Sequence, residues 1–193
     1  MIDIALAQVT GQLDLALKRQ FRLREDDQLV VLCHLHEQDG TVAKEVAGKV
    51  AAFLVNVERE AVPGASGAAG RLLSPRAPVQ PEPVHLNLMV MFAANYAGGH
   101  YTEALKMLSS TVSFFQGRPV FNHQNTPDLD PRIDRLTMEI ENLSIADLSN
   151  LWGVLSGKYL PSVLYRMRLL ALDAGQLGAQ VPRIVQPEAH VGA

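Results

Sequence analysis

The segment from Val84 to Ala94 constrains the fold more than any other part of this 193-residue chain. Its apolar side chains occupy both alternating sets of positions, with Leu88 and Phe92 in one set and Met91 in the other. Successive side chains of a strand point to opposite faces of a sheet, so a run that is apolar in both sets is typical of a strand buried on both faces. The sequence therefore predicts a central strand here.

The segment 136–172 predicts a strand, a helix and a second strand. Residues 137–141 alternate between apolar and acidic side chains, which is the period of a half-buried strand. Ser144 stands three residues before Asp147 at the start of an apolar helical pattern, as expected for a capped helix N-terminus. A second alternating run predicts the last strand at 162–172.

Four further elements are predicted from the spacing of apolar residues. Residues 2–17 and 101–115 carry apolar side chains at steps of three and four, the pattern of an amphipathic helix. Residues 29–35 and 50–58 are interpreted as strands. Together these elements predict an α/β (α+β) fold with a mixed sheet of about four to six strands and about three helices packed on it.

Length and composition fit one globular domain, which we expect to span 1–173. The chain has room for a single large core, and 48% of its residues are apolar. Within 60–83, glycines and prolines replace any apolar period, so an irregular loop is predicted there. This loop is either an exposed connector or a projection that becomes ordered against a neighbouring subunit. Residues 174–193 are predicted to form an extended or flexible C-terminal arm.

The charge, the apolar runs and the cysteine content of the sequence argue against several classes of protein. The formal net charge is −3 and no basic run exceeds two residues, so a nucleic-acid partner is not expected. No apolar run approaches the roughly 20 residues that cross a bilayer, and the N-terminus lacks the basic segment of a signal peptide. Cys33 is the only cysteine, so no intrachain disulfide can form. We expect a cytoplasmic product.

The sequence contains only partial matches to catalytic or metal-binding motifs. Residues 153–159 resemble a phosphate loop faintly, but three residues rather than four separate the glycines, and Tyr159 follows Lys158 where Ser or Thr is required. His34 and His36 are spaced to face one metal ion on a strand, yet no further ligand is placed to complete the site. We therefore expect a protein that is not an enzyme, with no cofactor and no metal.

Two pairs of charged residues have a simpler explanation than ligand binding. Glu139 and Glu141 share one face of a predicted strand and could hold a divalent cation or two arginines. Arg166 and Arg168 share one face of the last predicted strand. Opposite charges on neighbouring strands stabilise a sheet, so cross-strand ion pairs between these residues are the economical interpretation.

Five blocks of sequence carry a family resemblance. In chain order they are Leu86–Ala94, Tyr101–Ser109, Phe114–Phe121, Glu139–Ser144 and Asn150–Tyr165. This ordered series resembles the tail-terminator or cap proteins of extracellular contractile injection systems, the phage-tail-like particles typified by the antifeeding prophage and the Photorhabdus virulence cassettes. The resemblance covers nearly the whole chain.

The resemblance implies a structural protein with no catalytic residues. Members of the family assemble as a hexameric ring on the end of the inner tube and the contractile sheath. The implied partners are other copies of this chain, the inner tube protein and the sheath protein. The ring would end the growth of both polymers and couple them at the distal end. Such a protein would act in the cytoplasm during assembly and then belong to a particle that can be released.

The candidate contacts with these partners are Trp152, Lys158, Tyr159, Arg166 and Arg168. The pattern favours a core position for Trp152, although aromatic residues are also enriched at interfaces. An edge strand could accept a strand from a sheath arm, and we expect residues 161–172 or the arm after them to make such contacts.

Two other functions stay open from the sequence. One is an assembly adaptor that is absent from the mature particle. The other is a small hydrolase or a nucleotide- or metal-binding domain that uses Lys158 with Glu139 and Glu141.

Overall fold

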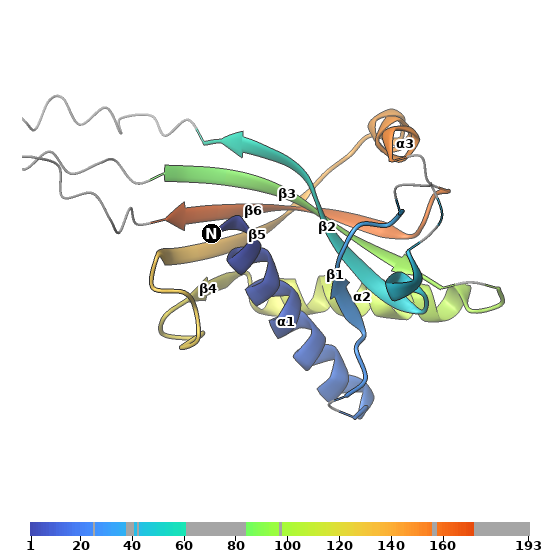
Figure 1. The fold of residues 1–193 in the computed structure, drawn as a ribbon, viewed down its shortest axis with the longest axis horizontal. Coiled ribbons are helices and arrows are strands. Elements are labelled where there is room, and N and C mark those ends of the chain that lie inside the picture. Colours follow the sequence, from blue (N-terminus) through green and yellow to red (C-terminus); the bar gives the residue numbers. More distant parts are fainter. Residues whose placement is uncertain are drawn as a thin grey trace, which may run out of the picture.

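The structure, a computed structural model, describes residues 1–24, 26–37, 41, 43–60, 84–96, 98–155 and 158–171. In chain order the elements are α1 (Ile2–Phe21), β1 (Val30–Leu32), a 3-10 helix η1 (Lys44–Val46), β2 (Lys49–Arg59), β3 (Val84–Asn95), α2 (Tyr101–Gly117), β4 (Val120–Asn122), β5 (Ile133–Glu141), α3 (Ile145–Val154) and β6 (Ser162–Ala171). The strands form one six-stranded sheet in the order β1-β2-β3-β6-β5-β4 (Figure 1).

The sheet is mixed, as predicted. β1 runs parallel to β2, and every other neighbouring pair is antiparallel. β3 lies inside the sheet, between β2 and β6, which confirms the central strand expected at residues 84–94. The predicted α+β class and strand number are also confirmed.

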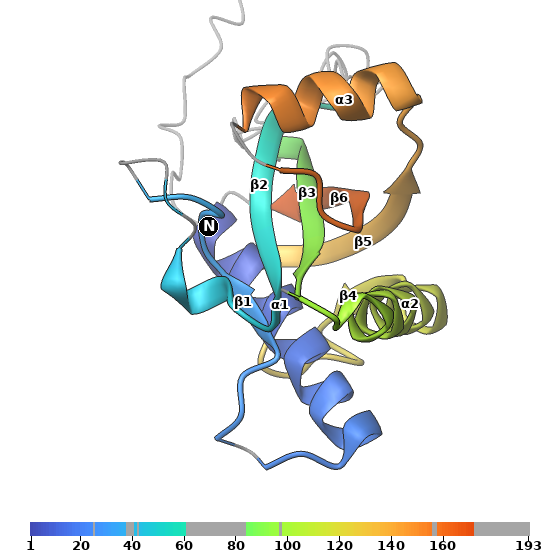
Figure 2. The same ribbon diagram turned by 90° about the vertical axis from the view of Figure 1, so that its right-hand side faces the viewer.

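Helices cover the sheet on both faces. α1 and α2 lie on one face and α3 lies on the other (Figures 1 and 2). β3 contributes Leu88, Val90 and Phe92 to the core beneath α1 and α2. Its alternate residues Met89 and Met91 belong to a second core beneath α3. The apolar residues on both faces of this strand are thus explained by a core on each side.

Aromatic side chains gather in the larger of these two cores. The ring of Phe115, on α2, lies 5.2 Å from that of Phe92 on β3 and 4.8 Å from that of Tyr165 on β6, measured between centroids. Phe114 and Phe121 extend the cluster. Burial raises the pKa of the Tyr165 hydroxyl to about 12. Although aromatic residues make up only 6% of the chain, this cluster joins α2 to the middle of the sheet.

A buried carboxylate connects α1 to the start of β1. Asp14 accepts hydrogen bonds at Oδ1 from the backbone N–H groups of Leu29 and Val30, at 2.8 and 2.9 Å. Its other oxygen, Oδ2, lies 2.8 Å from Nζ of Lys18, one helical turn further along α1. Buried polar groups are stable only when they are paired, and Asp14 has partners on both oxygens. The sequence analysis did not single out this residue.

Several predicted boundaries were wrong, and pairing explains why. The first strand was expected at 29–35 but pairs with β2 only over Val30–Leu32. β5 begins at Ile133 rather than at residue 137, and β4 was not predicted at all. β4 lies in a polar, turn-rich segment that shows no apolar period, so its sequence does not indicate a strand. It forms by pairing with residues 135–137 of β5. The predicted loop at 60–83, except Glu60, and the predicted arm at 174–193 lie outside the described residues.

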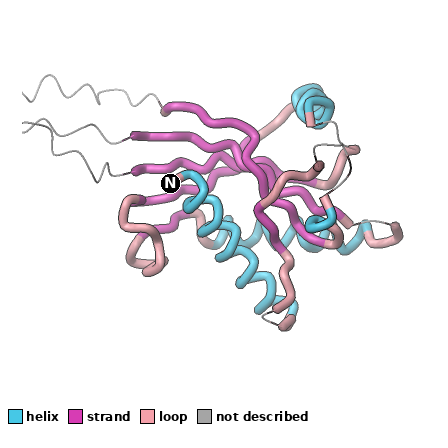
Figure 3. The backbone as a smooth tube through the Cα atoms, in the orientation of Figure 1, coloured by secondary structure: helices cyan, strands magenta, loops and turns pink. Residues whose placement is uncertain are grey.

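Residues 161–172 were expected to bind a strand of a partner at the edge of the sheet, but the strand they form lies inside the sheet. β6 (162–171) pairs with β3 on one side and with β5 on the other, so it cannot accept a further strand. β1 pairs only with Val50–Ala52 of β2. In the described part of the chain, residues 53–59 of β2 therefore have no strand on that side, and this stretch is the longest open edge (Figure 3).

We predict that Asp14→Ala lowers the free energy of unfolding by about 1–3 kcal/mol, because two buried backbone N–H groups lose their acceptor. Asp14→Asn keeps one acceptor oxygen and is expected to cost less. Asp3→Ala, which changes an exposed carboxylate paired with the N-terminal ammonium in the first turn of the same helix, is the comparison and is expected to cost less than Asp14→Ala. Urea denaturation measures all three. Equal stability of the Asp14→Ala and Asp3→Ala variants would contradict the bridging role.

Candidate functional site

The N-terminus of α3 is fixed by the predicted cap. The Ser144 hydroxyl accepts a hydrogen bond from the backbone N–H of Asp147 at 3.1 Å and donates one to Oδ2 of the same residue at 2.6 Å. A serine in this position satisfies one of the free N–H groups of the first turn. The cap thus determines where α3 starts, directly after β5.

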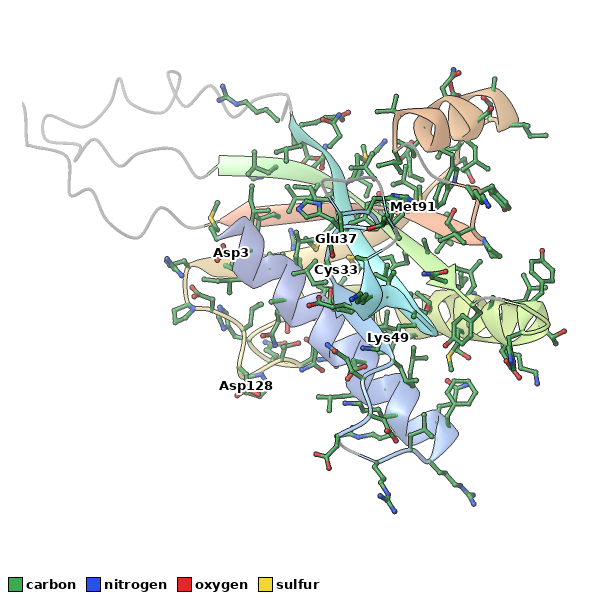
Figure 4. The ribbon with its side chains drawn as sticks, turned by 45° about the vertical axis from the view of Figure 1, so that its right-hand side comes forward. Asp3, Cys33, Glu37, Lys49, Met91 and Asp128 are labelled. Carbon is green, nitrogen blue, oxygen red and sulfur yellow. The ribbon has the colours of Figure 1, made fainter. Side chains whose placement is uncertain are left out.

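The inner side of α3 is part of the second core. Trp152 is only 4% exposed and belongs to a cluster with Phe53 and Leu164 from the sheet. Met91 of the same cluster lies on the sheet below α3 (Figure 4). The predicted core position of Trp152 is confirmed. Its ring also contacts that of Tyr159, with centroids 5.9 Å apart and the planes nearly perpendicular.

One side of α3 borders a groove of about 500 Å³, which we call the α3 groove. It is lined by Ile145, Leu148, Ser149, Trp152, Gly153 and Tyr159. Ile145 is 88% exposed and Tyr159 is 59% exposed, so the groove presents apolar surface to solvent. The buried Nε1 of Trp152 has no acceptor among the described residues. The same holds for other buried polar atoms, among them the hydroxyl groups of Tyr96 and Tyr165, so this N–H group does not by itself indicate a ligand.

A second exposed aliphatic residue on α3 lies away from this groove. Val154 is 82% exposed. It follows Ile145 by nine residues, which places it about half a turn around the helix axis. Its side chain does not line the α3 groove. Apart from the side that borders the core and the groove, α3 thus exposes one further aliphatic residue, at its C-terminal end.

The sheet face that α3 covers in part also carries a row of ion pairs, which we call the charged ladder. Nη2 of Arg166 lies 2.6 Å from Oε2 of Glu141. Arg168 contacts Glu139 at 3.1 Å through Nη2, and Nη1 lies 3.8 Å from Oε1 of Glu60 at the end of β2. The predicted cross-strand ion pairs between β5 and β6 are confirmed. Both strand carboxylates are thus occupied by arginines.

The geometry does not support the weaker chemical motifs. Among the described residues, no group of three or more His, Cys, Asp or Glu side chains is placed to hold a metal ion. β1 ends at Leu32, so the expectation that His34 and His36 share a strand face is wrong. Lys158 follows helix α3 and precedes strand β6, whereas a phosphate loop leads from a strand into a helix. Gly157 lies outside the described residues.

The structure divides the five candidate contact residues into two groups. Trp152 and Tyr159 meet in the α3 groove, and Lys158 is exposed next to Tyr159 in the chain. Arg166 and Arg168 belong to the charged ladder instead. Sequence reasoning did not identify Ile145 as a surface residue. Ile145 precedes Leu148 and Trp152 by three and seven residues, so the helical period assigned it to the buried face.

A family model described as the Pvc16 N-terminal domain matches residues 8–186. The chain belongs to this family. The match begins inside α1, includes every strand of the sheet and continues past β6, through residue 186. No curated protein matches the chain.

Two solved structures are similar to this family member. One is the PVC sheath/tube terminator of an extracellular contractile injection system in its extended state, with 15% identity and a TM-score of 0.47 over 95% of this chain and 63% of that chain. The other is the tube-terminating cap of the anti-feeding prophage, with 11% identity and a TM-score of 0.48 over 94% of this chain and 61% of that chain. The chain thus spans less than two thirds of the length of either structure.

None of the described helices combines the length and the apolar content that crossing a bilayer requires.

We predict a small, salt-sensitive coupling within the charged ladder. In a double-mutant cycle of Arg166→Ala and Glu141→Ala, the coupling should be about 0.5–1 kcal/mol at low salt, because both side chains are partly exposed and screened. It should fall as NaCl is added. A cycle of Arg132→Ala with Glu141→Ala is the control and should give no coupling, since Arg132 pairs with Asp130. The free energies of unfolding are measured by urea denaturation. Zero coupling between Arg166 and Glu141 at low salt would show that this ion pair does not contribute to stability.

Proposed function

We propose that this chain is the tail terminator of a contractile injection system. Copies of the chain form a closed ring that ends growth of the inner tube and the sheath and couples the two at the distal end. Membership of the Pvc16 N-terminal domain family over residues 8–186 is the observation that carries this proposal. The five ordered sequence blocks support the same function.

The proposed mechanism is steric and geometric. A growing tube or sheath exposes, on its last layer, the surface that the next subunit would bind. A ring that covers this surface without offering a new one stops addition. Closed rings are built from heterologous contacts, in which one face of a copy meets a different face of the next. We infer a homohexamer, with the inner tube protein and the sheath protein as partners on the two other sides.

The candidate binding surfaces are compatible with such a role. The α3 groove, with Trp152, Lys158 and Tyr159 at or beside it, offers apolar surface held on a rigid helix. The charged ladder presents Arg166 and Arg168 on the same sheet face. These surfaces bind by shape and charge and need no reaction centre. We propose that they contact neighbouring copies or the polymer ends.

A strand from a sheath arm would have its place on β2. Residues 53–59 keep an open edge in the described part of the chain, and an exposed edge can pair with an added strand through main-chain hydrogen bonds. This assignment replaces the earlier expectation for residues 161–172. We infer that the ring is assembled in the cytoplasm and is then carried on a particle that leaves the cell.

Particles made in cells that lack this chain test the proposal. We expect tubes and sheaths of abnormal or uncontrolled length, or unstable sheaths, in electron micrographs. Supplying the wild-type chain from a plasmid should restore a narrow length distribution. If the particles have normal length and stable sheaths without the chain, it is not the terminator.

A further inference from the structure

One edge of the sheet is closed by its own turn, and the other is open. At the β4 edge, Nδ2 of Asn125 donates to the carbonyl oxygen of Val120 at 2.8 Å. Oδ1 of the same side chain accepts from the N–H of Asn122 at 3.0 Å. At the opposite edge, residues 54–59 of β2 have no strand beside them in the described part of the chain (Figure 3). Only this second edge has main-chain groups left for an added strand.

The main-chain groups of Leu54 point to the open edge. Successive residues of a strand direct their N–H and C=O groups alternately to one side and the other. The N–H of Val50 bonds to Leu29, just before β1, so the even-numbered residues in this half of β2 point away from β3. Leu54 is the first of them beyond Ala52, the last residue that pairs with β1.

The main-chain groups of Val57 and Arg59 point to the same edge, because the register of β2 against β3 shifts after Leu54. Beyond the shift, the N–H of Glu60 bonds to the carbonyl oxygen of His85 on β3. The even-numbered residues here therefore face β3, and the odd-numbered ones face outward. An added strand would meet outward groups at three residues of β2.

The side chain of Asn56 covers one of these outward groups. Its Oδ1 accepts a hydrogen bond from the N–H of Val57 at 2.9 Å. Its Nδ2 donates to Oε1 of Glu58 at 3.1 Å. Asparagine side chains that bond to nearby backbone compete with the ladder of a sheet. A strand that paired with Val57 would have to displace Asn56 from it.

Leu54 and Val57 leave apolar surface beside the edge. In the ladder with β3 they pair with Val90 and Leu88, whose side chains belong to the core beneath α1 and α2. Leu54 is 38% exposed and Val57 is 42% exposed, as expected where no strand lies beyond them. An added strand would cover them with apolar side chains at alternate positions.

Glu58 supplies a charge on the opposite face. It pairs with Asn87 of β3, which pairs in turn with Arg168 of β6, so its side chain lies on the face of the charged ladder. The three carboxylates of that ladder are paired with arginines, whereas Glu58 forms no ion pair among the described residues. Opposite charges on neighbouring strands stabilise a sheet, so the next strand is expected to place Lys or Arg beside Glu58.

The sheet of a second copy is a poor source of the added strand. Its β4 edge cannot pair with β2, because Asn125 occupies the outward groups of that edge. Pairing of β2 with β2 of a second copy would be isologous, whereas a closed ring is built from heterologous contacts. An extended segment of a different protein meets neither obstacle.

We propose that residues 54–59 of β2 bind an amphipathic strand of the sheath protein, and that Asn56 is a removable cover on this edge. The strand places branched apolar residues against Leu54 and Val57 and a Lys or Arg beside Glu58. Asn56 leaves the N–H of Val57 when the strand binds. This inference rests on the terminator of the proposed function, and it names the chemistry of the partner and the residue that controls access.

Amide hydrogen exchange, followed by NMR in the full-length chain, tests the contact with a defined probe. The probe is a short synthetic peptide of alternating valine and lysine. It is expected to slow exchange at Leu54, Val57 and Arg59, and to leave Glu60 unchanged because that N–H is already bonded to β3. A peptide of alternating valine and glutamate is the matched control and should bind about tenfold more weakly.

Variants at three exposed positions separate the parts of the proposal. Asn56→Ala removes the cover and should tighten binding of the valine–lysine peptide about two- to tenfold, the effect of one hydrogen bond. Glu58→Lys should reverse the preference, so that the valine–glutamate peptide binds more tightly. Val57→Lys should weaken binding about tenfold or more. Leu15→Lys, at a residue 45% exposed on α1, is its matched control and should leave binding unchanged.

Three outcomes would overturn the proposal. Slow exchange at Leu54 and Arg59 in the chain without peptide would mean that another segment of the chain already covers the edge. Equal binding of the two peptides would remove the charge selection by Glu58. Unchanged binding in Asn56→Ala would show that this side chain does not control access.

Particles from cells that carry these variants separate this inference from the terminator itself. With Val57→Lys as the only copy of the chain, sheaths are expected to be unstable in electron micrographs, whereas Leu15→Lys should give stable sheaths. If Val57→Lys gives normal particles while cells without the chain give abnormal ones, the edge contact is refuted and the terminator stands. Normal particles from cells without the chain refute the terminator, and this inference with it.

Discussion

The burial of β3 on both faces is the constraint on which the rest of this structure depends. A strand with apolar side chains on both sides is stable only if each face is covered. α1 and α2 supply one cover, and the Phe92, Phe115 and Tyr165 rings join that layer to the sheet. α3 supplies the other cover, but a helix of ten residues spans only part of the face. The remainder of that face carries the charged ladder, in which Arg166 and Arg168 are paired with strand carboxylates. The two faces are therefore different in kind: one is closed by two long helices, and the other combines a short helix with a polar sheet surface.

This asymmetry has a functional consequence. α3 is held by its Ser144 cap and by Trp152 in the core, so its outward side chains are presented on a rigid support. Ile145 is exposed on that support and lines the α3 groove. In the proposed ring, contacts between copies would use apolar surface of this kind, held in one fixed geometry. Shape and charge on a rigid domain are sufficient for capping, and the mechanism proposed here requires no chemical step.

The sequence predicted the features that have a local or periodic cause. The two-sided burial of β3, the amphipathic helices, the Ser144 cap and the pairing of Glu139 and Glu141 with two arginines all follow from spacing along the chain. Features that depend on distant partners were missed. β4 forms because residues 135–137 lie opposite it, and Asp14 is buried because two N–H groups fifteen and sixteen residues away need an acceptor. The position of β6 between β3 and β5 was also invisible, since strand order is set by tertiary packing rather than by local pattern. The same limit explains the groove: Ile145 fits the apolar helical period, and only the packed structure places it at the rim.

The central claim is that copies of this chain form a cap at the end of a contractile particle. Electron microscopy of purified particles that carry a gold-labelled epitope on this chain tests it most directly. The account predicts label at one end of each tube and sheath, in a single ring-shaped cluster. Label distributed along the sheath, or particles with intact ends and no label, would contradict it.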